Sequence, residues 1–319
     1  MLVDGNTSPF TDNSKTKLMD KGEYTVKYLT TGVYPVYEAT GTYKSIATSM
    51  LQCAHDRGDC VAIIDHGNNP NRPLGDADPL SIYNHLLQED NGISNSDELN
   101  VFGTMFTPWA TYSTPSGPKG ATINLMPASF GYLTALATSI QSNANWLSIA
   151  GINRGLPPTI QALNLVPRLT NVIADSYQPR TARALNAITN IKPYGLTLWG
   201  NRTLASNADG NLTATSFLNV RNMVSDIKKV AYTTAKKLLF EQDSTTLWTS
   251  FKFEIARTLD KMIAGYGLSS YKIIRGTTKY DGTPLAKGEV AAIIKIIPLY
   301  AIEDFEITVV MADDDVEVS

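Results

Sequence analysis

The residues VAIIDHG at 61–67 constrain the fold more than any other stretch of the chain. A short apolar run that ends in an acid is typical of a strand buried on both faces, as in a parallel sheet. Before it, apolar residues recur at helical spacing from Tyr43 to Ala54, and Gly58 ends that pattern. A helix followed by a buried strand is half of an α/β unit, so we expect a layered α/β domain.

Asp65, at the end of this run, also resembles the acid of a Ser-His-Asp triad as a subtilisin-like protease presents it. The chain has only 3 histidines to serve as the base, His55, His66 and His85. None has the His-Gly-Thr setting of such a site, and GTMF at 103–106 offers no serine. We interpret Asp65 as architectural. The alternative is a hydrolase with a divergent triad of Asp65, His66 or His85 and an unassigned serine.

Other patterns that could bind cofactors or metals are incomplete. SGPKGAT at 116–122 lacks the spacing of a phosphate-binding loop. Asp76 and Asp78 have no downstream Glu at the spacing of a calcium loop. Cys53 and Cys60 are the only cysteines in the sequence, and they lack the short spacing of a metal-binding pair. We therefore predict two buried thiols. We therefore predict no catalytic, cofactor-binding or metal site.

Composition narrows the possible partners. The formal net charge is -3, so the chain lacks the excess of basic residues expected of a nucleic-acid binder. No apolar run approaches the ~20 residues that cross a bilayer, and no signal peptide is visible. With 319 residues and 43% hydrophobic content, the chain is long enough for two lobes. We predict no nucleic-acid or membrane partner.

Three segments follow from the patterns along the chain. We expect an extended lead-in over 1–40, with a strand in EYTVKYLTTG at 23–32. An α/β domain over 41–180 would add a strand at 99–106 and a helix at 126–140, separated by an irregular loop.

The third segment, 181–319, reads as an α+β domain. YGLTLW forms a strand that ends at Gly200, and two apolar stripes predict long helices over 220–239 and 248–263. The second helix would stop at Gly265. LSSYKIIRG, a turn at Asp281-Gly282, the run EVAAIIKIIP, expected to be buried, and DFEITVVMA supply three strands.

This third segment resembles the C-terminal domain of contractile phage tail sheath proteins. NIKPYGLTLWGNRTL, FLNVRNM and LLFEQDSTTLW occur in the order of the family's motifs, and the resemblance extends across roughly 130 residues. Asn201, Asn222, Gln242 and Asp243 depart from the family pattern. The resemblance assigns structural or assembly roles to Trp199, Gly200, Arg202, Asn219, Arg221, Phe240, Glu241, Trp248, Phe305, Ile307 and Val309.

The resemblance implies a subtilisin-like, non-catalytic α/β domain followed by a smaller α+β sheath domain. It implies a virion protein, assembled in the host cytoplasm, whose partners are other sheath subunits, the inner tail tube and the baseplate. Terminal strands would join subunits by adding to a neighbouring sheet, with no cofactor. Large-genome phages carry divergent sheaths of this sort. Family members are commonly longer, so the resemblance is also compatible with a core fragment that is monomeric.

Individual side chains have structural interpretations too. Trp199 is expected to bury its ring, and Arg202 to fork a carboxylate such as Glu241 or Glu303. Glu241 and Asp243 are expected to cap the following helix. A third functional hypothesis is a tail-associated module that binds a host surface through exposed Tyr and Trp in the 106–118 loop.

Overall fold

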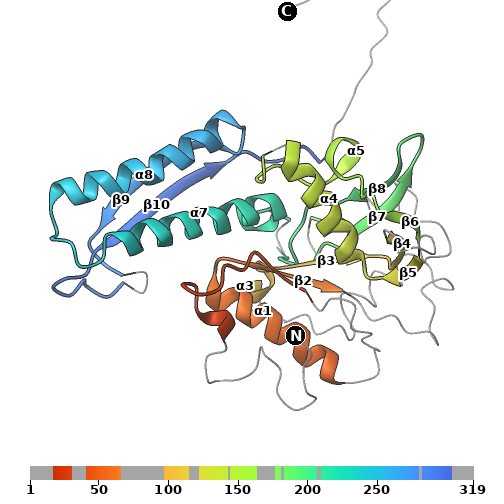
Figure 1. The fold of residues 1–319 in the computed structure, drawn as a ribbon, viewed down its shortest axis with the longest axis horizontal. Coiled ribbons are helices and arrows are strands. Elements are labelled where there is room, and N and C mark those ends of the chain that lie inside the picture. The colour runs from red at the N-terminus through yellow and green to blue at the C-terminus, as the bar shows by residue number, and fades with distance from the viewer. Residues whose placement is uncertain are drawn as a thin grey trace, which may run out of the picture.

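A computed structural model describes residues 17–30, 41–65, 97–114, 122–142, 144–163, 177–180, 183–206, 210–279 and 282–303. Within these residues, a sheet-based body carries an elongated lobe of two long helices and a β-hairpin (Figure 1). His66, His85, Asp76, Asp78, Phe305, Ile307, Val309 and the predicted strand DFEITVVMA lie outside the described residues.

The body is built on a five-stranded sheet with the order β1-β2-β3-β7-β8. Its strands are β1 (Tyr28–Thr30), β2 (Val61–Asp65), β3 (Gly103–Thr107), β7 (Asn186–Ile191) and β8 (Gly195–Trp199). The first four run parallel to their neighbours, and β8 returns antiparallel to β7. The strand predicted at 61–65 is confirmed, and the lead-in contributes β1 at the edge. The strand predicted over 99–106 is confirmed only from Gly103, because residues 97–100 form a short helix.

Strand β2 is buried along its whole length, as the apolar run predicts. Ala62 and Ile64 pack in one core with α1 (Gly41–Arg57), whereas Val61 and Ile63 pack in a second core with α4 (Ala128–Ser142). Because successive side chains of a strand point to opposite faces, α1 and α4 cover opposite sides of the sheet. Both helices and the two buried thiols are confirmed.

The segment predicted as an irregular loop after residue 106 instead contains strands. β4 (Ala110–Thr114) pairs antiparallel with β5 (Thr122–Met126) and with β6 (Ile160–Leu163), in a second sheet of order β5-β4-β6. Pro and Gly in this segment suggested a loop, but the alternating residues around Tyr112 fit a pleated strand. Short elements complete the body: η1 (Lys17–Met19), α3 (Asp97–Asn100), α5 (Gly151–Arg154) and η3 (Ala214–Ser216).

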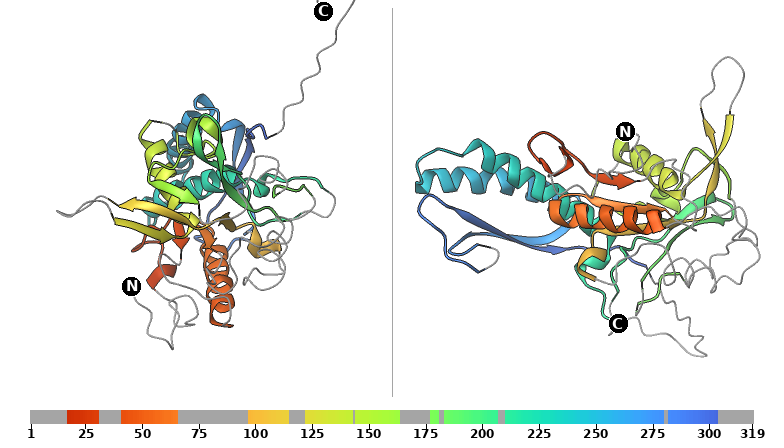
Figure 2. Two further views of the ribbon diagram at one scale, coloured as in Figure 1. Left: turned by 90° about the vertical axis from the view of Figure 1, so that its right-hand side faces the viewer. Right: turned by 90° about the horizontal axis from the view of Figure 1, so that it is seen from below.

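The elongated lobe contains α7 (Leu218–Lys237), α8 (Thr245–Ala264), β9 (Leu268–Gly276) and β10 (Ala291–Pro298). The two strands pair antiparallel and the two helices cover one face of this hairpin (Figure 2). The apolar stripes of the helices form its core with Leu268 and Ile273. The α+β arrangement of two long helices on a small sheet is confirmed.

Two expectations need adjustment. The run at 289–298 is not buried, because only alternate residues of β10 face the helices, and the others are exposed. The sheet also crosses the boundary expected at residue 181, since β7 pairs with β3. The division into 1–40, 41–180 and 181–319 stays a prediction.

Candidate assembly site

Gly200 lies at the centre of the predicted motif, where β8 turns toward α7. Its φ of +131° lies in a region that side chains disfavour, and an added Cβ would lie 2.5 Å from Asn186 Oδ1 and 2.6 Å from Gln178 Nε2. Glycine is therefore required both for the backbone and for the space. The turn brings residues 201–204 against the edge of β3, where the Leu204 amide donates to the Gly103 carbonyl at 2.9 Å.

Asn186, from β7, fixes this turn through its side chain. Its Oδ1 accepts from the Arg202 amide at 3.0 Å, and its Nδ2 donates to the Arg202 carbonyl at 2.9 Å. The same Nδ2 donates to Thr104 Oγ1 at 2.8 Å. All three residues are buried, so these hydrogen bonds satisfy backbone groups that no water reaches. The sequence reasoning missed Asn186, although a polar residue at the start of an apolar strand is a usable signal.

The Arg202 side chain reaches Glu303, one of the two carboxylates expected. Nε donates at 2.9 Å to both carboxylate oxygens, and Nη2 donates to Oε2. The guanidinium also lies 5.0 Å from the centre of the Phe217 ring, whose own centre is 5.0 Å from that of Tyr300. The pair therefore holds residues 300–303 against the start of α7, and this is the last part of the chain that the structure describes.

Asn201 caps helix α7 from a distant position in the sequence. The first amides of a helix lack internal partners, and Phe217 at the N-cap offers no side-chain acceptor. The Asn201 carbonyl accepts from the Leu218 amide at 2.9 Å, and Asn201 Oδ1 accepts from the Asn219 amide at 3.2 Å. Asn201 Nδ2 returns a bond to Asn219 Oδ1 at 2.7 Å. This departure from the family pattern thus has a structural use.

Arg221 is buried on the body side of α7. Its guanidinium carbon lies 3.6 Å from the centre of the Phe102 ring, and Nη2 donates to the Gly58 carbonyl at 3.4 Å. Burial lowers the pKa of Arg221 to about 10, and the neighbouring Cys60 opposes this shift. The side chain still carries its charge at neutral pH, so a cation–π contact stabilises α7 against the body.

Of the remaining predicted residues, Trp199 lies in the body, and Phe240, Glu241 and Trp248 lie at the far end of the lobe. Trp199 is half-buried against the body core, whereas Phe240 and Glu241 are exposed after α7. Trp248 stacks on Phe251 with ring centres 5.5 Å apart. The motif residues therefore form two groups, one at the junction of body and lobe and one at the tip.

The expected cap of α8 by Glu241 and Asp243 is wrong. Ser244 is the N-cap, and its side chain accepts from the Leu247 amide at 3.1 Å. Asp243 instead accepts from Arg275 Nη2 at 2.7 Å. Ser244 caps the helix in place of Glu241 and Asp243 because it directly precedes the first helical residue. From that position its short side chain reaches the amide of the third helical residue.

Asp65 contacts the amino end of α4. Its Oδ1 accepts from the Ser129 amide at 3.0 Å, while its Oδ2 has no hydrogen bond to any residue that the structure describes. Burial raises the pKa of Asp65 to about 7, against the opposing effect of the hydrogen bonds from Ser129 and Thr30. This placement favours the architectural interpretation.

The described residues offer no base to Asp65. The ring nitrogens of His55 lie 3.0 Å from Asp56 Oδ1 and 3.3 Å from Glu98 Oε1, away from Asp65. In the same ranges, no group of three or more His, Cys, Asp and Glu side chains is placed to hold a metal ion. None of the helices described combines the length and hydropathy that would cross a bilayer.

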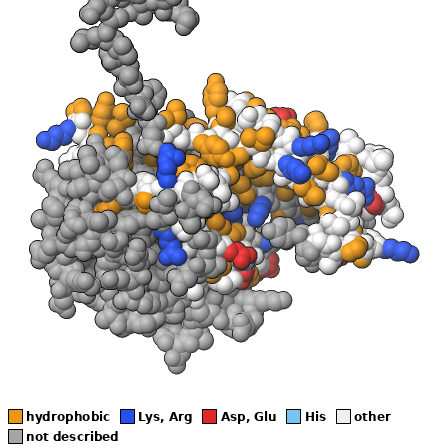
Figure 3. Space-filling view, turned by 180° about the vertical axis from the view of Figure 1, so that it is seen from behind, with side chains coloured by type: hydrophobic (Ala, Val, Ile, Leu, Met, Phe, Trp, Pro, Cys, Tyr) orange, Lys and Arg blue, Asp and Glu red, His pale blue; other side chains and the backbone are white. Residues whose placement is uncertain are grey.

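The outward face of the β9–β10 hairpin is apolar and basic. Ile293 and Ile297 are 43% and 59% exposed. Lys272 and Lys295 are directly opposite each other in the register. Seen from this side, hydrophobic side chains gather along the lobe with basic residues between them (Figure 3). Like charges opposite each other destabilise an isolated hairpin, so this face is suited to a covering partner.

Trp109 and Tyr112 do not support the host-binding hypothesis. Both were expected to be exposed in the 106–118 loop, but both are buried, and the Tyr112 hydroxyl donates to the Pro127 carbonyl at 3.0 Å. Both side chains are buried because the segment does not form a loop: Tyr112 lies in β4, and Trp109 directly precedes it.

The sheet body and elongated lobe together define the fold found in contractile injection systems. A chain of the contracted anti-feeding prophage baseplate superposes with a TM-score of 0.60 and 17% identity, covering 86% of this chain and 66% of that one. A chain of the contracted PVC sheath complex, from an extracellular contractile injection system, gives 0.58 and 16%, covering 85% and 68%. At these identities the likeness concerns the fold.

The sequence itself is similar to a phage protein. It is 25% identical over 283 residues to the tail sheath protein of Vibrio phage KVP40, covering 86% of this chain and 40% of the relative. No protein-family model matches the sequence. The chain thus spans two fifths of the length of that relative, and its resemblance to contractile tail sheath proteins is confirmed.

Proposed function

We propose that the chain is a structural subunit of a contractile phage tail sheath, which polymerises around an inner tail tube and contracts to drive the tube through the host envelope. The observation that carries this proposal is the alignment of 86% of the chain with a phage tail sheath protein. The similarity in fold to chains of contracted sheath and baseplate assemblies supports it. In this role the protein works without catalysis.

The proposed partners are other copies of the chain, the inner tube and the baseplate, within the virion tail after assembly in the host cytoplasm. The exposed outer face of the hairpin supports a role in subunit contacts, because Ile293 and Ile297 would lose contact with water in a lattice. The alternating Phe305, Ile307 and Val309 would form an arm strand that adds to a neighbour's β9–β10 sheet.

The motif residues at the junction would have a mechanical role. Arg202 holds Glu303 immediately before the proposed arm, so pulling on the arm would load the junction rather than the hairpin alone. We also propose that the body is of the subtilisin-like α/β class, which parallel strands β1, β2 and β3 between α1 and α4 support.

Negative-stain electron microscopy of the purified protein tests the proposal. Hollow cylinders or stacked rings are expected, either spontaneously or when isolated tail tubes are added as a template. Particles that stay monomeric at high concentration under both conditions would contradict it. Labelling by a serine-hydrolase probe, absent from heat-denatured controls, would instead favour the divergent hydrolase.

A further inference from the structure

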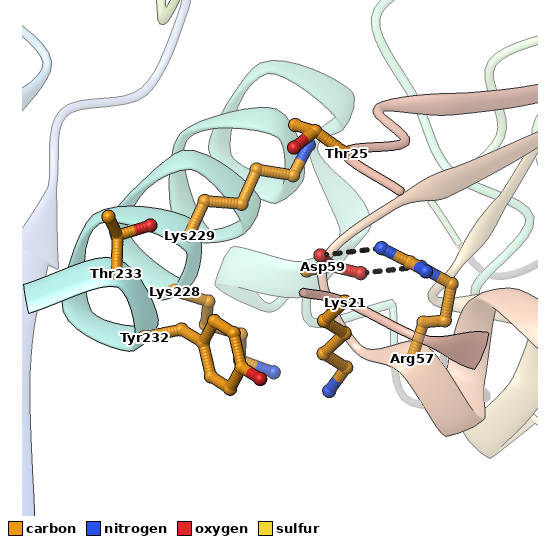
Figure 4. A pocket seen from close by; sticks show the side chains of 8 residues that line it. All are labelled: Lys21, Thr25, Arg57, Asp59, Lys228, Lys229, Tyr232 and Thr233. Carbon is orange, nitrogen blue, oxygen red and sulfur yellow. Dashed lines mark hydrogen bonds and ion pairs between the residues drawn. The ribbon is translucent and has the colours of Figure 1, made fainter. Parts of the chain in front are cut away.

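A pocket of about 320 Å³ lies where α7 passes the segment 17–30 and the turn after α1 (Figure 4). Helix α7 supplies two lysines and two hydroxyl side chains, the 17–30 segment a lysine and a threonine, and the turn an ion pair. We call it the lysine pocket, and its lining is Lys21, Thr25, Arg57, Asp59, Lys228, Lys229, Tyr232 and Thr233.

The acid in this pocket is already paired. Arg57 Nε donates to Asp59 Oδ1 at 2.9 Å, and Nη2 donates to Oδ2 at 3.1 Å. The buried Arg57 also donates to the carbonyls of Leu18 and Tyr24, which holds the 17–30 segment in place. Asp59 therefore cannot fully compensate further cations, because a bidentate partner occupies both of its oxygens.

Three lysines remain without an ion pair to any residue that the structure describes: Lys21, Lys228 and Lys229. Partial burial, then repulsion from Arg221 and Lys21, lowers the pKa of Lys228. Burial also lowers the pKa of Lys229, although Asp59 and Asp226 oppose the shift. In Figure 4 the amines of Lys228 and Lys21 lie on the same side of the pocket as the Tyr232 hydroxyl.

This combination of amines and hydroxyls is suited to carboxylates. Clustered cations that repel one another gain from an anion that enters between them, and hydroxyl groups donate to its remaining oxygens. The sequence contains a matching segment. Residues 312–319 read ADDDVEVS, and Asp313–Asp315 is the only run of three consecutive acids in the chain.

The segment 17–30, which lines the lysine pocket, and strand β10 lie on opposite sides of the molecule. In the right-hand view of Figure 2, the segment 17–30 lies at the top, whereas β10, which leads to residue 303, lies at the bottom. To reach the pocket of its own chain, the segment after β10 would have to pass round the body. The same segment of a second copy would not. This geometry favours an exchange between copies.

We propose that the lysine pocket binds the acidic segment 312–319 of a second copy of this chain, as an electrostatic contact distinct from strand addition at β10. The inference rests on the proposed function in that it requires neighbouring copies. It adds a second attachment point to the C-terminal arm, on an element of the body rather than on the hairpin.

Zero-length carbodiimide cross-linking tests the contact, since it joins an amine to a carboxylate only when they touch. The 319-residue chain is prepared in ordinary and in ¹⁵N-labelled form, mixed in equal amounts, cross-linked and digested for mass spectrometry. We expect links between Lys21, Lys228 or Lys229 and Asp313–Asp315 that combine one light and one heavy peptide. The Lys228→Gln/Lys229→Gln variant should lower the yield by about tenfold, and the Asp313→Asn/Asp314→Asn/Asp315→Asn variant likewise.

Lys252→Gln, an exposed lysine of α8, is the matched control and should leave the yield unchanged. Links that carry only one isotope would show that the chain's own segment occupies the pocket, and would overturn the proposal. An equal yield from the pocket variant would do the same. Electron microscopy of the same samples separates the two ideas: cylinders without these links refute the acidic contact alone, and links without cylinders refute the sheath function alone.

Discussion

Asn186 hydrogen-bonds both the amide and the carbonyl of Arg202, with distances of 3.0 Å and 2.9 Å. The side chain thus imitates the pairing of a neighbouring strand at a place where the chain leaves the sheet. Replacing it by alanine leaves the buried Arg202 amide without a partner, at a cost of about 1–3 kcal/mol, whereas the Arg202 carbonyl keeps its hydrogen bond from Thr104 Oγ1.

Asn186→Ala should therefore lower the free energy of unfolding by about 1–3 kcal/mol, measured by urea denaturation. Asn190→Ala is the control, because Asn190 lies on the same strand but is exposed. Equal losses for the two variants would show that the bridge to Arg202 contributes nothing special.

Gly200→Ala should destabilise the protein more than Gly195→Ala. Both glycines have positive φ, +131° and +93°, but a Cβ meets nothing within 4 Å at Gly195 and lies 2.5 Å from Asn186 Oδ1 at Gly200. The shared backbone strain costs about 1–3 kcal/mol, and the collision adds to it only at Gly200. Thermal melting of the two variants measures the difference, and identical melting temperatures would refute the close approach.

The Arg202–Glu303 pair should show a coupling of about 1–3 kcal/mol in a double-mutant cycle with Arg202→Met and Glu303→Gln. The side chains are 4% and 23% exposed, so water screens the charges poorly. Arg275 and Asp243 form a matched pair at 40% and 54% exposure, for which we expect less than about 1 kcal/mol. A reversed order would mean that the junction is open to solvent.

Asp65 should make stability depend on pH. Its pKa in the folded protein is about 7, above the ordinary value of 3.8. The folded state therefore holds the proton more tightly, and the stabilisation present below pH 3.8 is lost as pH rises through about 7.

Asp65→Asn, which keeps an acceptor for the Ser129 amide, should remove this slope. The difference between the variant and the native chain should grow by up to about 4 kcal/mol between pH 4 and pH 8. Denaturant titrations across that range provide the measurement. Parallel curves for the two proteins would place the Asp65 carboxylate in contact with water.

Ile297→Lys should prevent assembly into cylinders while leaving the melting temperature within a few degrees of the native value. Ile297 is 59% exposed in the isolated chain, so its loss removes little internal packing. Ile294, on the inward face of the same strand, packs on the lobe core, and Ile294→Lys should instead unfold the lobe. Cylinders of normal length from Ile297→Lys would remove the hairpin face from the subunit interface.

Most elements could be predicted from sequence because their patterns are local. Residues close together in the sequence are enough to identify three of them: the apolar stripe of α7, the buried run of β2 and the glycines that end α8. The exposure of one face of β10 could not be predicted. An apolar run indicates that a strand is covered, but it does not indicate whether the same chain or another one covers it. Strands β4 and β5 were missed because Pro and Gly dominate the residues around them.

The site was predictable where a residue has few possible partners. A lone arginine after a glycine turn suggested a carboxylate, and Glu303 is that carboxylate. Asn186 and the capping by Asn201 depend on contacts between segments 16 or more residues apart, about which propensity says nothing. The lysine pocket joins three such segments, so its charges become neighbours only in the folded protein.

Helix α7 takes part in two cores, since Leu218 packs in the body and Val220, Met223 and Ile227 pack in the lobe. At 1.5 Å per residue, its 20 residues span about 30 Å. Asn201 and Arg221 hold its first turn to the body, and Lys27 holds it again through Asp226. A turn of about 10° about its first residue would displace the far tip by about 5 Å, roughly one helical pitch.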